Sequence, residues 1–160
     1  MARARGYWLM KSEPGTYSID DLARDGRTRW EGVRNYQARN YMRDQMKVGD
    51  LALFYHSSAE PSGVAGVAEI ASAAYPDPTQ FDGQSPYHDP KSKKDDPAWL
   101  LVDVTFVEKL PEVLALQRLK ADASLSSMLV LRRGQRLSVM PVERAHFARV
   151  LRLGKARTRV

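Results

Sequence analysis

The sequence predicts one α+β domain, in which a small twisted β-barrel is flanked by helices. Two observations indicate this fold class. Short segments that alternate between apolar and polar residues, or that are continuously apolar, recur through the chain and are typical of strands. Segments with an apolar residue at every fourth position lie among them and are typical of helices. The 160 residues show no internal repeat and no linker, and a hydrophobic fraction of 43% suffices for one core.

The first third of the chain predicts a strand followed by two helices. Residues 7–11, YWLMK, are expected to form the strand. Ser18 begins a short helix because SIDD is a Ser-x-x-Asp capping box, and Gly26 ends that helix. Residues 34–46 are predicted to form a longer helix, with an apolar stripe beside a mostly basic one.

The rest of the chain predicts mainly strands and ends in a helix. Residues 75–97 are rich in Pro, Asp, Ser, Gly and Lys and predict a long irregular loop, which in a small domain is usually functional or disordered. The basic segment 152–160 is expected to fray. The remaining elements are strands at 51–56, 64–75, 98–110 and 137–139, a helix from Pro111 to about Ala121, and a helix that begins near Pro141.

Composition excludes several classes of protein. The chain has no cysteine, which rules out disulfides, cysteine-based zinc sites, iron–sulfur clusters and thiol nucleophiles. Its three histidines are far apart, so we expect no metal and no cofactor. No apolar run approaches the ~20 residues that cross a membrane, and the predicted protein is soluble, in the cytoplasm or, in a eukaryote, the nucleus.

The net charge of +6 suits a polyanionic partner, of which nucleic acid is the commonest. An inert basic surface would explain the charge equally well. Arg34, Arg39 and Arg43 lie on the predicted 34–46 helix, and guanidinium groups suit phosphate oxygens.

Two short stretches place polar or aromatic groups where a ligand could bind. Lys11, Ser12 and Glu13 follow the first strand, at the predicted mouth of the barrel, although a surface Lys–Glu pair would look the same. Trp30 lies in a polar loop, where it could cap the core or offer a flat face to a base. Ser57 follows the 51–56 strand and could contact a base edge or cap a turn.

One carboxylate, Glu69, interrupts an otherwise apolar strand. A buried glutamate needs a partner, and Lys11 is a candidate. Such a pair would be either structural or an acid–base couple.

Several long motifs together resemble the EVE domain of the PUA-like superfamily. They occur in one order from about Tyr7 to Leu151 and include YWLMKSEP, WEGVRNYQARN, GDLALFYHSS, GVAGVAEI and RRGQRLSVMPV. The resemblance implies a PUA-like fold, a small mixed β-barrel flanked by helices, as a single domain over 1–160 with short basic N- and C-terminal tails. The superfamily also contains YTH domains, which hold N6-methyladenosine in an aromatic cage, and SRA domains, which flip modified cytosine.

The resemblance to YTH domains implies the outline of a pocket. Lys11 and Ser12 match a pocket-lining Lys-Ser pair, Trp30 matches a cage tryptophan, and Tyr87 stands where a second cage aromatic is expected. Met140 occupies a position where the EVE pattern is expected to show Gln. The full predicted site consists of base-binding Lys11, Ser12, Trp30, Asn35, Ser57, Tyr87 and Ser138, and phosphate-binding Arg34, Arg39, Arg43 and Arg136.

We therefore favour a non-catalytic, monomeric module that reads a modified base, such as methylated cytosine or adenine, in DNA or RNA. The alternative is an enzyme, because ASCH domains of the same superfamily include hydrolases of modified nucleosides that use Lys and Glu, here Lys11 and Glu69. A third hypothesis is an interaction domain whose pocket holds no ligand.

Overall fold

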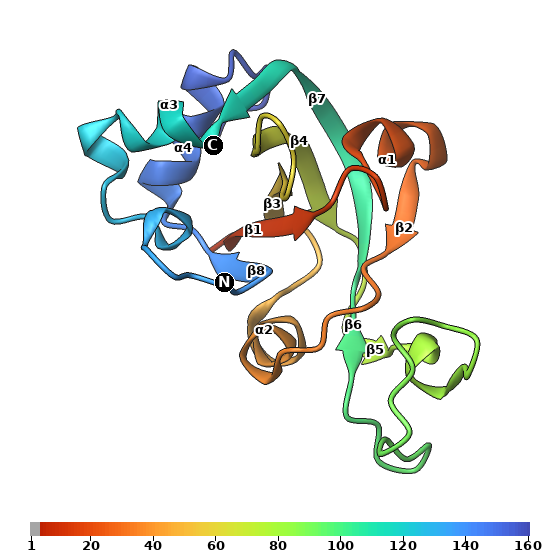
Figure 1. Cartoon of the computed structure of the whole chain (residues 1–160). Coiled ribbons are helices and arrows are strands. Elements are labelled where there is room, and N and C mark those ends of the chain that lie inside the picture. Colours follow the sequence, from red (N-terminus) through yellow and green to blue (C-terminus); the bar gives the residue numbers. More distant parts are fainter. Residues whose placement is uncertain (1–3) are drawn as a thin grey trace.

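The computed structural model describes residues 4–160. A six-stranded mixed sheet, in the order β2-β7-β4-β3-β1-β8, curls into a half-barrel (Figure 1). β5 and β6 form a separate two-stranded sheet. The strands are β1 (Tyr7–Ser12), β2 (Arg27–Arg29), β3 (Leu51–His56), β4 (Gly63–Ile70), β5 (Tyr75–Pro76), β6 (Leu100–Leu101), β7 (Asp103–Ala115) and β8 (Val139–Pro141).

The described helices cover the edges and one side of the curled sheet (Figure 1). α1 packs against β7 and β2, while α3 and α4 lie together at the opposite edge of the molecule. They are α1 (Ile19–Asp25), α2 (Tyr36–Asn40), α3 (Leu116–Lys120) and α4 (Arg144–Leu153). The predicted α+β class with flanking helices is confirmed, and the predicted small mixed β-barrel takes the form of a half-barrel.

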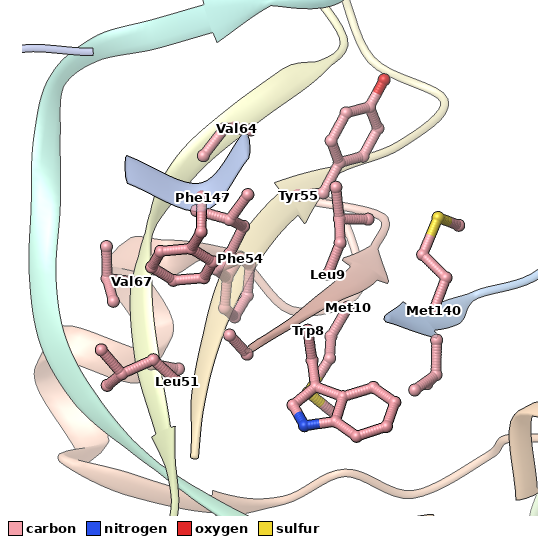
Figure 2. Packing of buried hydrophobic residues seen from close by; sticks show 14 of the residues in the cluster. Trp8, Leu9, Met10, Leu51, Phe54, Tyr55, Val64, Val67, Met140 and Phe147 are labelled. Atoms are coloured by element: carbon pink, nitrogen blue, oxygen red, sulfur yellow. The ribbon is translucent and has the colours of Figure 1, made fainter. Parts of the chain in front are cut away.

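The core lies on both faces of the central strands. Every residue of β3 is buried, and Figure 2 shows Leu51 and Phe54 of this strand together with Trp8 and Phe147 among the side chains of the core cluster. β1 runs parallel to β3, with Tyr7 opposite Leu51 and Ser12 opposite His56. The polar end of β1 therefore lies level with the end of β3.

The capping box of α1 forms as predicted. The Ser18 hydroxyl accepts a hydrogen bond from the Asp21 N–H at 3.1 Å, and the Asp21 carboxylate accepts one from the Ser18 N–H at 2.8 Å. Gly26 ends the helix at φ +77°, a backbone conformation that favours glycine.

The predicted helix 34–46 is shorter and less regular than expected. α2 begins at Tyr36, and from Tyr41 to Gln45 the chain widens into a π-turn that ends when the Met46 N–H donates to the Tyr41 carbonyl at 2.9 Å. The apolar stripe nevertheless faces the core, because Met42 and Met46 are buried.

The predicted helix from Pro111 is wrong. β7 continues through Pro111 to Ala115, and only Leu116–Lys120 is helical. The pairing with β4 jumps from Gly66–Lys109 to Val64–Leu114, so Pro111 lies in a bulge. A residue without an N–H is tolerated there because no ladder hydrogen bond is required of it.

The C-terminal segment packs against β7 instead of fraying. The Glu108 carboxylate accepts hydrogen bonds from the backbone N–H groups of Arg157 at 3.0 Å and Thr158 at 2.7 Å, and Ala156 is buried. Glu108 of β7 thus holds the backbone of the C-terminal segment in place. The sequence of this segment alone gives no sign of that partner.

His56 joins the end of β3 to the start of α1, because its Nε2 accepts a hydrogen bond from the Ile19 N–H at 3.1 Å. Burial lowers the pKa of His56, although the charge of Asp20 opposes that shift. The unfolded chain therefore binds a proton at a higher pH than the folded one. The stability that the neutral ring contributes is complete above its unfolded pKa of about 6.5 and is lost as the pH falls below it.

We predict that the free energy of unfolding declines as the pH falls below about 6.5, and that His56→Gln removes most of this decline. Denaturant unfolding at several pH values between 5 and 8 measures it. His88→Gln, at an exposed position, is the matched control and should keep the slope of the unmodified protein. If the free energy of unfolding of His56→Gln declined with falling pH as steeply as that of the unmodified protein, His56 would not be the group responsible.

Candidate functional site

A cavity of about 500 Å³ opens where β1 and β3 end. Ser12 aligns with His56 across the parallel ladder, and the Lys11 N–H donates to the Ser138 carbonyl at 2.8 Å, so three segments converge at this point. Of the seven predicted base-binding residues, six line the cavity: Lys11, Ser12, Trp30, Ser57, Tyr87 and Ser138. Arg136 also lines it.

Lys11 brings a positive charge to the cavity wall. Its side chain is partly buried, and its Nζ lies 5.8 Å from the centre of the Tyr55 ring. Burial lowers the pKa of Lys11. Within residues 4–160 no carboxylate forms an ion pair with this ammonium group. Its donors are therefore available to an acceptor in the cavity.

The serines at the cavity differ in their availability. The Ser12 hydroxyl donates to the Tyr17 carbonyl at 2.6 Å, which leaves Ser12 Oγ as an acceptor for a ligand. Ser57 and Ser138 form backbone contacts, with the Ser57 N–H donating to the Ser12 carbonyl at 3.0 Å. Neither of their hydroxyls bonds to another residue in the described part of the chain, so each can donate or accept.

Trp30 is largely buried, with 7% of its surface exposed. Its backbone N–H donates to the carbonyl of Val102, between β6 and β7, at 2.9 Å. The centres of the Trp30 and Phe54 rings lie 5.4 Å apart, and the two ring planes are nearly perpendicular at 87°. Only a small part of the Trp30 side chain is therefore exposed at the cavity. The rest of the ring packs in the core, as the alternative that Trp30 caps the core predicted.

The indole N–H of Trp30 differs from those of the other two tryptophans. Trp8 Nε1 donates to Asp50 at 3.0 Å, and Trp99 Nε1 donates to Asp89 at 2.7 Å. In the described part of the chain Trp30 Nε1 has no acceptor, and no buried side-chain nitrogen there lacks a partner. The Trp30 indole N–H therefore keeps some exposure to solvent, and Trp30 is one of the residues that line the cavity.

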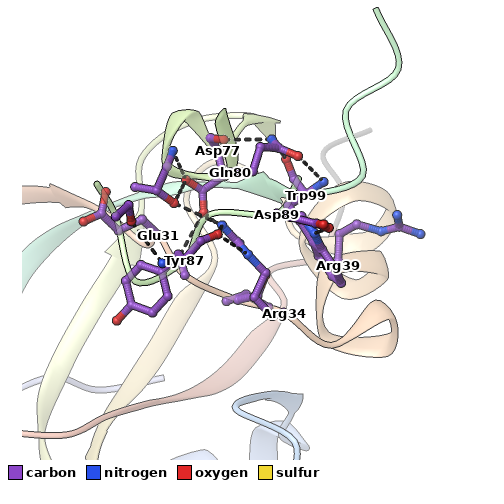
Figure 3. A network of polar contacts seen from close by, with 12 residues as sticks. Glu31, Arg34, Arg39, Asp77, Gln80, Tyr87, Asp89 and Trp99 are labelled. Carbon is purple, nitrogen blue, oxygen red and sulfur yellow. Dashed lines mark hydrogen bonds and ion pairs between the residues drawn. The ribbon is translucent and has the colours of Figure 1, made fainter. Parts of the chain in front are cut away.

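A buried carboxylate, Asp77, joins the Trp30 segment to the long loop (Figure 3). It accepts hydrogen bonds from the Gly32 N–H at 2.8 Å, from Arg34 Nη1 at 3.1 Å and from the Thr79 hydroxyl at 2.6 Å. Burial alone would raise the pKa of Asp77, but the hydrogen bonds from Gly32, Thr79 and Arg34 lower it below its usual range. The carboxylate is thus ionised and satisfied inside the protein.

Arg34 connects Asp77 to the cavity. Besides its bond to Asp77, its Nε and Nη2 donate to the Tyr87 carbonyl at 3.0 and 2.7 Å. This clamp holds Tyr87 at the cavity wall, where its ring lies 2.7 Å from the position that a Cβ on Gly32 would occupy. Gly32, at φ +88°, is therefore required both for its backbone conformation and for the close approach of Tyr87.

The structure assigns other partners to most of the arginines that we predicted to bind phosphates. Arg34 is used in the clamp, and Arg43 pairs with Asp44 at 2.8 Å. Arg39 donates to the Ala98 carbonyl at 2.7 Å and lies over the Tyr36 ring. None of these three lines the cavity.

Asn35 also lies outside the cavity, because it caps α2 by accepting a hydrogen bond from the Ala38 N–H at 3.0 Å. Met140 is buried in β8 opposite Leu9 and does not line the cavity either. The expected Gln-to-Met difference therefore does not alter the cavity wall directly.

The proposed pair of Lys11 and Glu69 does not form. Glu69 is opposite Leu51, and Leu51 is opposite Tyr7, whereas Lys11 is opposite Tyr55. Four residues of strand length, about 13 Å, and two strand spacings separate the two side chains. The acid–base couple expected from the sequence is therefore absent.

The sequence alone did not indicate that Gly32 and Asp77 shape the cavity. A glycine two positions after a candidate cage tryptophan was a usable signal for a close approach. Asp77 carried no such signal, since Gly32 and Arg34 are 45 and 43 residues away along the chain.

We predict that Asp77→Asn loosens the loop from 75 to 99, because an amide nitrogen would face N–H donors and Arg34 would lose its counter-charge. Breaking a buried ion pair costs about 3–5 kcal/mol of stability. Denaturant unfolding should show this loss, and hydrogen exchange should show faster amides in this loop. Asp95→Asn, exposed in the same loop, is the control and should change neither; equal effects of the two variants would contradict the role of Asp77.

Within residues 4–160 no helix is long and apolar enough to cross a membrane, and no group of His, Asp and Glu residues has the arrangement of a metal site.

Comparison with known proteins gives consistent matches over nearly the whole chain. Human thymocyte nuclear protein 1 is 42% identical over 92% of this chain and 73% of its own length. A crystal structure from Pseudomonas putida is 53% identical, with a TM-score of 0.90 over 92% of this chain and 99% of that one.

A crystal structure of human THYN1 protein in complex with DNA containing 5-methylcytosine is 42% identical, with a TM-score of 0.87 over 96% of this chain and 99% of that one. An ASCH protein from Zymomonas mobilis shares the fold, with a TM-score of 0.55 at 10% identity. The family model of the EVE domain matches residues 6–153. This chain therefore belongs to the EVE domain family.

Proposed function

We propose that this protein binds DNA that carries a modified cytosine, and that the modified base turns out of the duplex into the cavity at the end of β1. The observation that carries the proposal is the cavity of about 500 Å³ that Lys11 and Trp30 line. We take the indole N–H of Trp30, which has no acceptor among the described residues, to face this cavity. The complex of human THYN1 protein with 5-methylcytosine DNA supports it. Recognition of modified RNA, a monomeric state and a cytoplasmic or nuclear location stay predictions.

The polar groups of the cavity suit the hydrogen-bonding edge of cytosine. That edge presents acceptors at O2 and N3 and a donor at the N4 amino group. The Lys11 ammonium group and the Trp30 indole N–H supply donors, while the Ser57 and Ser138 hydroxyls can serve as either. Ser12 Oγ, already donating to Tyr17, can accept from the amino group.

The energy balance requires contact with aromatic and apolar surface as well. Turning a base out of the duplex costs a few kcal/mol, and contact with an aromatic ring returns about 1–3 kcal/mol. Tyr17, Trp30 and Tyr87 are the aromatic residues at the wall, and Val33 adds aliphatic surface. Burying one methyl group would add about 0.8 kcal/mol, or about a fourfold preference, so we expect a modest preference for modified DNA.

The geometry favours binding over hydrolysis of a nucleoside. The hydrolase hypothesis assigned the chemistry to Lys11 with Glu69, and the strand register separates them. The distant ASCH protein is similar in fold alone. We therefore retain the reading of a modified base as the function of this site.

We predict that Lys11→Met lowers the affinity for duplex DNA with one 5-methylcytosine by about 13- to 160-fold, the effect of losing a charge-assisted hydrogen bond of about 1.5–3 kcal/mol. The apolar stem is kept, so folding should be unaffected. Fluorescence anisotropy at fixed salt measures the affinity. Lys47→Met removes an equal charge at an exposed position and is the control.

We predict that Trp30→Phe, which keeps a ring against Phe54, reduces the ratio of affinities for methylated and plain duplexes toward one. Folding is checked by thermal unfolding of the same samples. A ratio unchanged in Trp30→Phe and an affinity unchanged in Lys11→Met would together contradict this use of the cavity. Stronger binding to methylated RNA than to methylated DNA would contradict the proposal that DNA is the nucleic acid bound.

A further inference from the structure

The arginines within residues 4–160 fall into two groups according to their side-chain partners. Eight of them donate to acceptors within the protein: Arg24, Arg27, Arg29, Arg34, Arg39, Arg43, Arg149 and Arg159. By contrast, the remaining arginines within residues 4–160 form no ion pair and no side-chain hydrogen bond. Among these, Arg132, Arg133 and Arg136 stand close together in the sequence. All three are exposed and lie within five residues.

These three arginines belong to one turn, residues 132–136, which we call the arginine turn. The Gln135 N–H donates to the Arg132 carbonyl at 3.2 Å and closes it, and Gly134 has φ +77°. Gln135 Oε1 accepts from the Leu137 N–H at 2.9 Å, and Leu137 is buried. The backbone of the turn is thus anchored, while its guanidinium groups extend into solvent.

The arginine turn borders two hollows on the same face of the β1–β8 pair. Lys11 and Ser138 edge the cavity described above, whereas Leu9 and Met140, two residues away on each strand, edge a second hollow of about 280 Å³. Because side chains alternate between faces, both pairs lie on one face and about 7 Å apart along the strands.

Each end of the arginine turn lines one of these hollows. Arg136 lines the cavity and Arg132 lines the second hollow. Three carboxylates lie at the hollows: Glu13 and Glu31 line the cavity, and Glu143 lines the second hollow. Within residues 4–160 none of them forms an ion pair with an arginine of the turn.

We propose that the arginine turn holds the DNA backbone beside the cavity. Arg136 binds the phosphate next to the turned-out nucleotide, and Arg132 and Arg133 bind phosphates farther along the strand toward the second hollow. This inference rests on the proposed function, because it takes the cavity as the place where the base enters. It transfers the phosphate contacts expected of Arg34, Arg39 and Arg43 to a different segment of the chain.

The test is the salt dependence of binding. Each phosphate neutralised contributes about −0.9 to the slope of log K against log salt concentration for duplex DNA. Arg132→Ala with Arg133→Ala should therefore reduce the magnitude of the slope by about 1.8. Affinity for methylated and plain duplexes should fall in parallel, because phosphates carry no information about the base. Arg132→Lys with Arg133→Lys should restore the slope.

A matched double variant controls for net charge. Arg118→Ala with Arg152→Ala removes two exposed arginines on α3 and α4 that line neither hollow, and it should leave the slope within about 0.5 of that of the unmodified protein. An equal loss of slope in both double variants, or no loss in the arginine-turn variant, would overturn the proposal.

The same data separate this inference from the proposed function. If the unmodified protein prefers methylated DNA and the arginine-turn variant keeps the full slope, only the phosphate assignment fails. If the slope falls as expected but neither protein distinguishes methylated from plain DNA, the reading of the base fails and the arginine turn stands.

Discussion

The buried carboxylate of Asp77 is the contact on which the shape of the cavity depends. It receives the N–H of Gly32 from the segment that carries Trp30, and through Arg34 it holds the carbonyl of Tyr87 in the long loop. Two adjacent parts of the wall, the segment of Gly32 and the Tyr87 ring, are thereby fixed to one ion pair. An ionised carboxylate in this position is stable because every acceptor direction is used, in agreement with its lowered pKa.

The other half of the cavity follows from the sheet. β1 and β3 are parallel and end level with each other, and β8 pairs with β1 from the opposite edge. Apolar side chains fill the middle of these strands, so the first polar side chains, Lys11 and Ser12, appear where the sheet stops. The Lys11 ammonium group at that place is only partly buried, and its Nζ lies over the Tyr55 ring.

Local signals predicted the fold class, the capping box at Ser18 and six of the cavity residues, because these depend on short patterns or on motifs shared with the family. Long-range partners could not be predicted. Arg39 looked like a phosphate ligand because its acceptor, the Ala98 carbonyl, lies 59 residues away. Pro111 looked like a helix start because the bulge that accommodates it is set by β4.

The central claim is that the indole N–H of Trp30 faces the bound base, and ¹⁵N-labelled protein tests it most directly. The three indole N–H signals differ in their partners, since Trp8 donates to Asp50 and Trp99 to Asp89. On titration with duplex DNA containing one 5-methylcytosine, the Trp30 signal should shift most and the other two should stay nearly fixed. Binding that leaves the Trp30 signal in place, or that moves Trp8 or Trp99 instead, would contradict the account.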